Sequence, residues 1–332
     1  MSKSLTSKWK RFIERNRKSE GYLLKKIVAQ KLYQIARAIL IFGLCFLILQ
    51  PILNKISVSF MEEKDLYDPT IIVVPRNFTL NNYKLVSYLI SYWKVLRHTL
   101  GISLIAAFAQ LACATLVGYG FARFKFPLKK FWFACVILVI VVPPQTIMSS
   151  LYLNFRFFDV FGIIKLITGS TINLQNSLIP YILLCMTGMG LKSGLYIFLI
   201  RQYFRGIPKE LEEAAYVDGC GNLQTFIRIM LPDATPILTS CFLFAFVWQW
   251  TDSFYARMFL KGTTLLATEL PAITSRLTEY IVSTTGSGKA STAYGLAMIS
   301  TGMIMTIIPL LLIYVVAQKG FVESLSQTGL KM

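Results

Sequence analysis

The chain has 332 residues, 55% of them hydrophobic and only 15% charged, and its formal net charge is +18. Soluble domains carry about 25% charged residues, so this composition excludes an ordinary soluble fold and indicates an all-α membrane protein. Positive charge also suits nucleic acids, but the longest soluble basic stretch is too short to form a core of its own, so we expect no nucleic-acid partner.

Apolar runs divide the rest of the chain. A helix that crosses a lipid bilayer needs ~20 mostly apolar residues, and six runs are suitable. They lie at residues 36–54, 96–122, 131–151, 178–204, 234–258 and 293–316. We therefore expect a six-helix transmembrane domain at 36–318, between a basic N-terminal extension at 1–35 and a C-terminal tail at 319–332.

Basic residues gather on one side of this six-span arrangement. Residues 1–37 carry eleven Lys and Arg against two acids, and the loops after the second and fourth runs add four basic residues each. These three segments hold nineteen of the thirty-four basic residues in the chain. The positive-inside rule then predicts that both termini are cytoplasmic. No small-residue cleavage site follows the first run, so we interpret that run as a retained anchor.

Polar side chains inside the apolar runs are candidates for a solute path. Lys192 interrupts the fourth run, and an intramembrane charge usually faces a cavity or a protein partner. Gln145 in the third run and Gln110 in the second are weaker cases. Three glycines surround Lys192, namely Gly188, Gly190 and Gly194. They support the alternative that this region packs closely against other helices and that Lys192 only pairs with a partner subunit.

The segment at 206–232, between the fourth and fifth runs, predicts two short helices outside the membrane. Glutamates near the start of the first helix suit its positive end. Gly219 is placed to stop that helix in a left-handed turn. Asn222 can then cap the second helix, and Pro232 ends it.

Helices this short are marginal unless they pack against something. Leu211, Ala214, Ala215 and Asp218 follow helical spacing on roughly one face, and the two alanines form a patch that a partner backbone can approach closely. Two interpretations stay open: the segment packs only on its own transmembrane bundle, or it docks a cytoplasmic partner.

The same segment carries seven residues at a specific spacing. They are Glu213, Ala214, Ala215, Gly219, Ile229, Leu231 and Pro232. This pattern, E-A-A-x-x-x-G followed after nine residues by I-x-L-P, resembles the signature of permease subunits of binding-protein-dependent ABC importers. The resemblance implies that these residues, together with Asp218, couple the chain to an ATPase subunit.

Four further stretches resemble the carbohydrate branch of that family, the maltose-type permeases. They lie at residues 75–84, 118–127, 198–215 and 317–331. In the last stretch, Gly320 and Ser324 replace an aromatic residue and a glycine that are usual in the family. The resemblance implies the fold of a type I ABC importer permease in the plasma (inner) membrane of a prokaryote. Its expected activity is the translocation of a sugar or oligosaccharide, without any catalysis of its own.

The resemblance also implies the partners of the chain. A second, different permease subunit forms a heterodimer with it, two ATPase subunits grip the short helices, and an extracytoplasmic solute-binding protein delivers the sugar. The same importer type with a non-sugar solute is the main alternative. An ATP-independent secondary transporter would show inverted repeats or several intramembrane charges, and neither is found. A membrane enzyme would need clustered reactive groups, whereas the chain has one histidine and no C-x-x-C pair, so we expect no metal and no cofactor.

Four side chains near the end of the fifth run are a second candidate for the solute path. Trp248, Thr251, Asp252 and Tyr255 recur at helical spacing, which predicts that they share one helical face. Trp and Asp suit a sugar, through ring stacking and hydrogen bonds to hydroxyl groups. The alternative is an aromatic belt at the membrane interface, because Asp252 lies about 27 Å along a helix that begins near residue 234.

Residues 284–292, TTGSGKAST, look like a phosphate-binding loop at first sight. That loop requires G-x-x-x-x-G-K-[ST], but Ser283 stands at the first glycine position and Ala290 at the metal-binding hydroxyl position. The segment also precedes the sixth run, on the face that we expect to be outside the cell. We therefore expect the chain to bind no nucleotide and its partner chains to hydrolyse the ATP.

Overall fold

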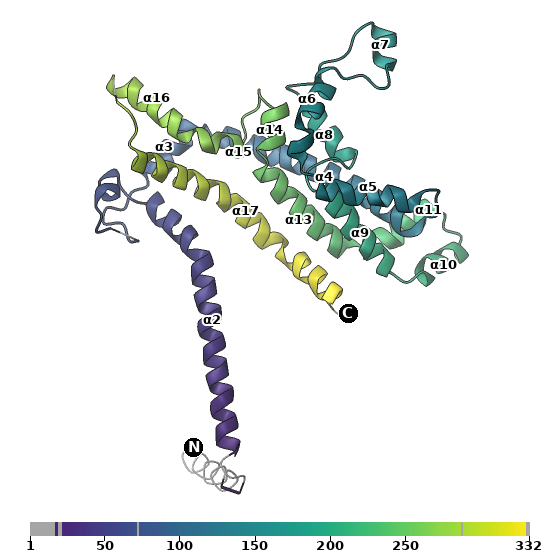
Figure 1. Ribbon diagram of the computed structural model, residues 1–332, viewed down its shortest axis with the longest axis horizontal. Helices are drawn as coiled ribbons and strands as arrows, with labels where there is room; N and C mark the ends of the chain where they lie inside the picture. Colours follow the sequence, from purple (N-terminus) through teal and green to yellow (C-terminus); the bar gives the residue numbers. More distant parts are fainter. Residues whose placement is uncertain (1–16, 19–21, 72, 287, 330–332) are drawn as a thin grey trace.

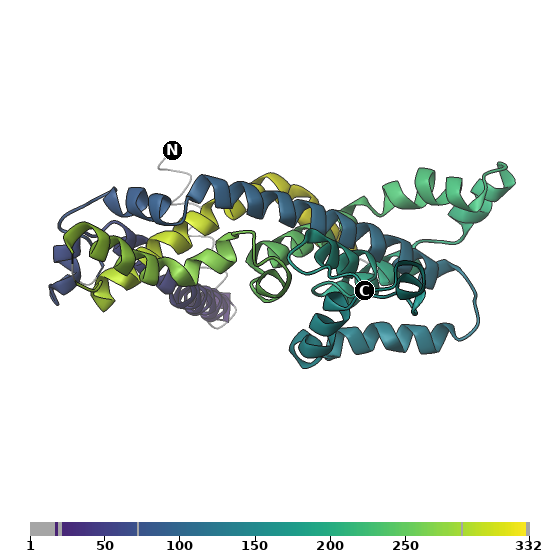
Figure 2. The same cartoon turned by 90° about the horizontal axis from the view of Figure 1, so that it is seen from above.

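The computed structural model describes residues 17–18, 22–71, 73–286 and 288–329, and within these ranges the chain forms helices and no strand. Three long helices run along an elongated bundle (Figures 1 and 2): α4 (Tyr92–Arg123), α13 (Thr235–Thr251) and α17 (Thr292–Gly329). A fourth, α2 (Tyr22–Ser59), projects away from it. This architecture confirms the expected all-α class.

The remaining helices are shorter. They are α3 (Asn81–Leu89), α5 (Lys129–Val141), α6 (Met148–Arg156), α7 (Ile163–Thr168), α8 (Leu178–Met186), α9 (Ser193–Gly206), α10 (Glu210–Val217), α11 (Asn222–Thr225), α12 (Leu231–Asp233), α14 (Phe254–Phe259), α15 (Leu266–Glu269) and α16 (Ile273–Thr285). Short 3-10 helices span Glu63–Tyr67, Pro144–Ile147 and Leu270–Ala272, and a π-helix spans Phe226–Met230.

The core lies where α4 packs against α9 and α13. Glycines bring the backbones together there. A Cβ added to Gly118 of α4 would lie 2.9 Å from Cγ2 of Ile200 on α9. A Cβ added to Gly194 of α9 would lie 2.8 Å from the carbonyl oxygen of Val136 on α5. The sequence offered two interpretations of the region around Lys192, a solute path or close packing between helices. The contact at Gly194 agrees with close packing.

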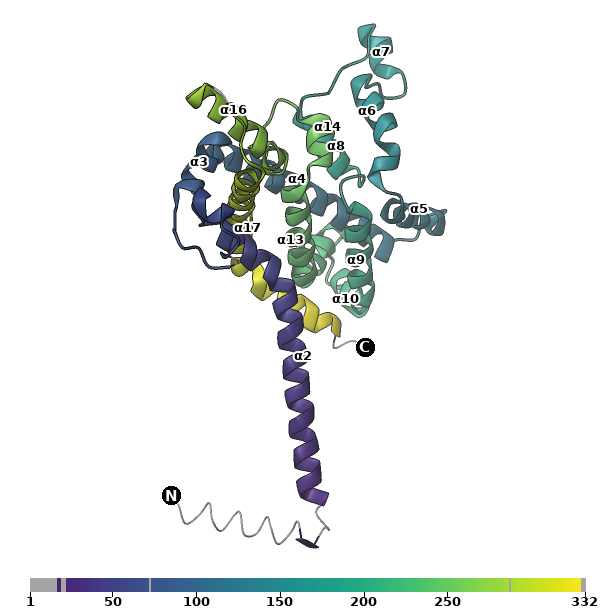
Figure 3. The ribbon, with the colours of Figure 1, turned by 60° about the vertical axis from the view of Figure 1, so that its left-hand side comes forward.

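The first helix stands apart from this core (Figures 1 and 3). The most apolar stretch of α2 has no buried residue, and the helix meets α17 only near its C-terminal end. It begins at Tyr22, so it extends well into the basic segment that we expected to precede the first span at residue 36. Residues 1–16 and 19–21 of that segment, and residues 330–332 of the expected tail, lie outside the described ranges.

The expected third and fourth spans are broken. The third ends as α5 at Val141, and the chain then bends by 99° into α6, because two prolines at 143 and 144 follow and hold the preceding residue in an extended conformation. The fourth consists of α8 and α9, separated by residues 187–192 with left-handed backbones at Gly188 and Lys192. By length and composition, the described residues contain three continuous membrane-spanning helices, or five if each bent pair counts as one span. An interruption of the fourth span near Lys192 is what the sequence predicts, whereas the bend in the third span was not expected.

The two segments singled out for nucleotide and partner binding lie at opposite ends of the bundle. α16 lies at one end and α10 at the other (Figures 1 and 2). The glycine-rich segment follows the end of α16 at Gly286 and leads into α17, so no strand precedes it. This context differs from that of a phosphate-binding loop, in which a strand leads into the loop.

Candidate coupling segment and candidate solute path

The turn after α10 has the conformation that the sequence predicts. α10 ends at Val217, and Gly219 has φ = +82°, in the left-handed region. The N–H of Cys220 donates to the carbonyl of Ala215 at 2.9 Å, and the N–H of Gly219 donates to that of Tyr216 at 3.1 Å, which closes the helix end. Nothing lies within 4 Å of a Cβ added to Gly219, so backbone strain is the penalty for any other residue there.

The second short helix begins and ends within one residue of the predicted positions. Gly221, not Asn222, occupies the N-cap position, and Asn222 is the first residue of α11. α11, the π-helix and α12 follow one another without a gap, and this helical stretch ends at Asp233, one residue after Pro232. The chain bends by 75° at Ala234, and α13 begins at the next residue, Thr235.

A buried ion pair holds α10 against the bundle. Oε2 of Glu212 lies 3.2 Å from Nε of Arg123 at the end of α4. Tyr119, one turn earlier on α4, donates its hydroxyl to Oε1 of Glu212 at 2.9 Å. Arg123 also donates to the carbonyl of Ile207, just before α10, at 2.8 Å. This anchor was not predicted, because the position of Glu210, Glu212 and Glu213 in the first turn of α10 indicated only a role at the positive end of that helix.

The motif residues divide between two faces of the segment. Glu213 and Ala214 are exposed, whereas Ala215 is 3% exposed and lies on the same inner face as Glu212. The expectation that a partner backbone can approach both alanines is therefore wrong for Ala215, because its side chain is buried. Of the remaining motif residues, Gly219 and Pro232 are exposed and Ile229 and Leu231 are half-buried, and the neighbouring Asp218 is exposed as well.

Apolar side chains extend the exposed face of the segment. Val217 is 88% exposed and Leu223 is 69% exposed, and both lie beside the Gly219 turn. Leu211 and Ile227 are exposed as well. The segment projects from the end of the bundle (Figure 2). Grouped apolar side chains on such a projection are typical of a protein interaction site.

The four candidate side chains of the fifth run do not share one helical face, so that prediction is wrong. α13 ends at Thr251 because Asp252 has an extended backbone. The Asp252 carboxylate instead accepts the N–H groups of Phe254 at 2.9 Å and Tyr255 at 3.3 Å, at the start of α14. Trp248 and Thr251 are exposed, whereas Asp252 and Tyr255 are buried.

Asp252 belongs to a buried polar network that joins α4, α8 and α13. The Tyr181 hydroxyl lies 2.5 Å from Oε1 of Gln249 and 3.1 Å from Oδ2 of Asp252. Nε2 of Gln249 donates to Oε1 of Gln110 at 2.9 Å, and Nε2 of Gln110 donates to Oγ of Ser193 at 2.7 Å. The network satisfies buried polar groups beside the break between α8 and α9, so its members stabilise the bundle from inside.

Two candidates from different helices come together on the surface. Nζ of Lys192, before α9, lies 5.0 Å from the ring centroid of Trp248 on α13, within the range of a cation–π contact. Thr251 lies one turn further along α13 and is exposed. Gln145 is exposed in the 3-10 helix after α5, and among the described residues it has no hydrogen bond to this group. A cation, an aromatic ring and a hydroxyl can together bind a polyhydroxylated solute.

Comparisons with known proteins identify the family. A model of the family described as binding-protein-dependent transport system inner membrane component matches residues 111–322. A probable ABC transporter permease protein of Pyrococcus horikoshii is 29% identical over 253 residues, covering 76% of this chain and 81% of its own length. The arabinooligosaccharides transport system permease protein AraQ of Halalkalibacterium halodurans is 26% identical over 294 residues. This match covers 87% of the present chain and 93% of the length of AraQ.

A solved structure shares the fold. The crystal structure of a bacterial ABC transporter involved in the import of the acidic polysaccharide alginate contains a chain that matches with a TM-score of 0.69 at 19% sequence identity. The match covers 88% of the present chain and 97% of that chain. It confirms the expected fold, that of a type I ABC importer permease.

Proposed function

This chain belongs to the family of binding-protein-dependent transport system inner membrane components, and we propose that it is the permease subunit of an ABC importer that moves a sugar or oligosaccharide into the cytoplasm. The segment from α10 to α12 carries the proposal. Glu212 fixes its inner face to α4, and its outer face is exposed. A segment attached rigidly on one side and open on the other can pass the movement of a docked partner to the bundle.

In this proposal, two ATPase subunits hydrolyse ATP, and this chain is not catalytic. Glu213 offers a charge to the docked ATPase, Ala214 allows close approach, and the Gly219 turn sets the direction of α11. When the ATPase pair closes, α10 moves with it. The ion pair between Glu212 and Arg123 then transmits that displacement to α4.

Two observations support a carbohydrate as the solute. A relative is named as a permease for arabinooligosaccharides, and the similar solved structure belongs to a transporter of an acidic polysaccharide. In the present chain, the Trp248 ring can stack on a sugar ring, while Lys192 and Thr251 can hydrogen-bond to hydroxyl groups. These three side chains form the proposed contact with the passing solute.

The remaining partners complete the importer. A second, different permease subunit forms the other half of the pore, and an extracytoplasmic solute-binding protein delivers the sugar. The unpartnered apolar surface of α2 supports contact with lipid or with that second subunit. The basic residues of the N-terminal segment and of the loops near α10 support cytoplasmic termini, in the plasma (inner) membrane of a prokaryote.

The test is transport by the complex that forms around the tagged full-length chain. The complex is purified from native membranes and reconstituted into liposomes, and uptake of labelled oligosaccharides is measured with and without ATP on the cytoplasmic side. We expect an ATPase to copurify and uptake to require both ATP and the solute-binding protein. ATP-independent uptake by the chain alone would instead support a secondary transporter.

A further inference from the structure

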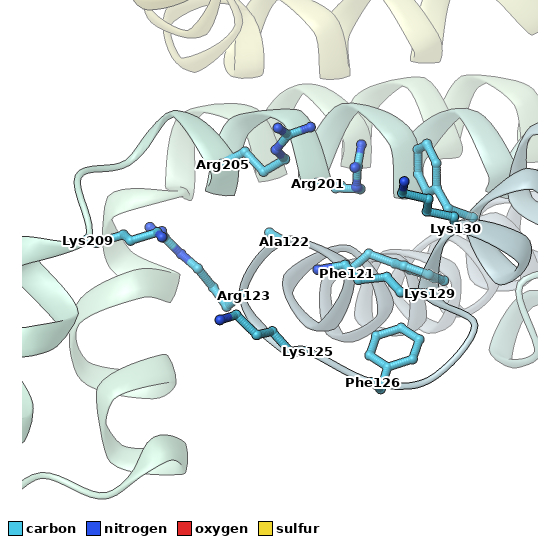
Figure 4. A pocket seen from close by; sticks show the side chains of 11 residues that line it. Phe121, Ala122, Arg123, Lys125, Phe126, Lys129, Lys130, Arg201, Arg205 and Lys209 are labelled. Atoms are coloured by element: carbon cyan, nitrogen blue, oxygen red, sulfur yellow. The ribbon is translucent and has the colours of Figure 1, made fainter.

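A strongly basic pocket lies where α4, α5 and α9 meet, beside the coupling segment (Figure 4). It has a volume of about 730 Å³. Seven of its lining side chains are basic and none is acidic. The basic ones are Arg123, Lys125, Lys129, Lys130, Arg201, Arg205 and Lys209. The candidate solute path includes none of them.

Most of this charge has no counterpart in the described part of the chain. Only Arg123 forms an ion pair there, with Glu212. Lys129 donates to the Phe124 carbonyl and Arg201 to the Gln202 side chain, both uncharged acceptors. Cations held this close together repel one another, so the pocket favours an anion that several of them can contact.

Aromatic residues hold part of the pocket in shape. The Arg201 guanidinium lies 3.8 Å from the centroid of the Phe133 ring, and Nζ of Lys129 lies 5.9 Å from that of Phe126. Nε of Arg201 is buried and has no hydrogen-bond partner among the described residues. An Arg already fixed against a ring loses little further freedom when its remaining donors bind an anion.

One wall of the pocket continues into an apolar surface. α5 begins in the pocket with Lys129 and Lys130, and the rest of the helix has no charged residue and no buried residue. Phe131 and Trp132 are 57% and 52% exposed next to the basic cluster, and Leu138 further along is 60% exposed. Basic and aromatic side chains followed by exposed aliphatic ones are typical of a protein surface that crosses from the lipid headgroups into the acyl chains.

We propose that this pocket binds the phosphate-bearing head group of an anionic phospholipid, with the acyl chains along α5. A soluble anion would use the basic side chains but not the adjoining apolar surface. A bound lipid would also contact Arg205 and Lys209, on the two sides of the connection into α10, and so brace that connection from the membrane side. The proposal depends on the pocket and not on the proposed transport activity.

Native mass spectrometry of the full-length chain can test this directly. The delipidated protein in detergent is offered equal amounts of phosphatidylglycerol and phosphatidylcholine with identical acyl chains. We expect preferential retention of phosphatidylglycerol. In a triple variant, Lys125→Gln, Lys130→Gln and Arg205→Gln, each lost charge should weaken that binding about fivefold. These three side chains are exposed, and no hydrogen bond or ion pair of theirs is found in the described structure, so the fold should be unaffected.

A second triple variant is the matched control. Lys25→Gln, Lys26→Gln and Lys31→Gln remove the same charge from exposed positions on α2 and should leave the preference intact. Equal losses in both variants, or no loss in the pocket variant, would overturn the proposal. So would displacement of phosphatidylglycerol by the same concentration of inorganic phosphate, which would indicate a site for a soluble anion. If the pocket variant fails to assemble with its partner subunits and the assembled complex shows no lipid preference, the pocket is a protein interface.

Discussion

Nε of Arg123 on α4 lies 3.2 Å from Oε2 of Glu212 on α10, and their side chains are only 8% and 10% exposed. The adjacent Glu213 is exposed. Two consecutive glutamates, of which only Glu213 belongs to the motif, therefore have separate tasks. Glu212 attaches the coupling segment to its own bundle, and Glu213 faces the proposed partner.

The first prediction separates these two tasks. Glu212→Gln keeps the shape and an acceptor for Tyr119 but leaves Arg123 without its charge partner. We expect a loss of about 3 kcal/mol in the free energy of unfolding, at the lower end of the values for broken buried pairs. Equilibrium unfolding in detergent, followed by circular dichroism, measures it. Glu213→Gln is the control and should stay within about 0.5 kcal/mol of wild type, while ATPase retention falls. Equal stability of the two variants would contradict the anchor.

The second prediction concerns the turn between α10 and α11. Gly219→Ser forces a side chain into a left-handed conformation, at a cost of roughly 1–2 kcal/mol, and should redirect α11. Substrate-stimulated ATP hydrolysis and uptake should fall together while binding-protein docking survives. Gly221→Ser is the matched control, since that residue has φ = −77° in an N-cap position that serine suits. If both variants transport like wild type, the turn does not direct coupling.

The third prediction compares two neighbouring alanines. Ala214 is exposed, so Ala214→Trp should leave the abundance of the chain unchanged and block docking of the ATPase. Ala215 is buried, so Ala215→Trp should overpack the inner face of α10 and lower stability by about 1–3 kcal/mol. Chain abundance in membranes and copurified ATPase are measured for both variants. Normal ATPase retention by Ala214→Trp would exclude this face as the docking site.

The fourth prediction separates the solute path from the buried network. Trp248→Ala and Lys192→Ala should each reduce uptake several-fold with normal assembly, because both side chains are exposed. Asp252→Ala should instead destabilise the chain by about 1–3 kcal/mol, since the Phe254 N–H and the Tyr181 hydroxyl lose an acceptor. Trp93→Ala, at another exposed tryptophan, is the control for uptake. Normal uptake in the Trp248 and Lys192 variants would favour the interfacial-belt interpretation.

The fifth prediction concerns the glycine-rich segment before α17. Lys289→Ala should leave ATP hydrolysis by the assembled importer within twofold of wild type, because the segment lies at the opposite end of the bundle from α10 and lacks the residues of a phosphate-binding loop. Hydrolysis is measured with the solute-binding protein and substrate present. A tenfold loss at normal assembly would show that the segment does contact nucleotide.

Features that depend on neighbouring residues could be predicted from the sequence. The left-handed turn at Gly219 follows from a glycine placed directly after a short amphipathic helix. The end of α13 had a readable signal too, because Asp252 stands where an aspartate can cap a following helix. The apolar residues that continue beyond it concealed that signal and suggested one uninterrupted span to residue 258.

Features that depend on distant residues could not be predicted in this way. Tyr181 and Gln249 are 68 residues apart in the chain, and Gln249 and Gln110 are 139 apart. A glutamine in an apolar run gives no sign of which other run it will face. The partner of Glu212 was hidden for the same reason, since Arg123 lies 89 positions earlier and looks like an ordinary basic residue at a helix end.

The isolation of α2 makes the chain modular. Residues 25–54 of that helix are exposed apart from Gly43, so the core from α3 to α17 does not depend on which side chains they carry. The outward surface of α2 can therefore diverge to suit a different neighbour without any compensating change elsewhere in the chain. A chimera joined near residue 54, with the first helix of another family member in front of it, should keep the fold of everything that follows.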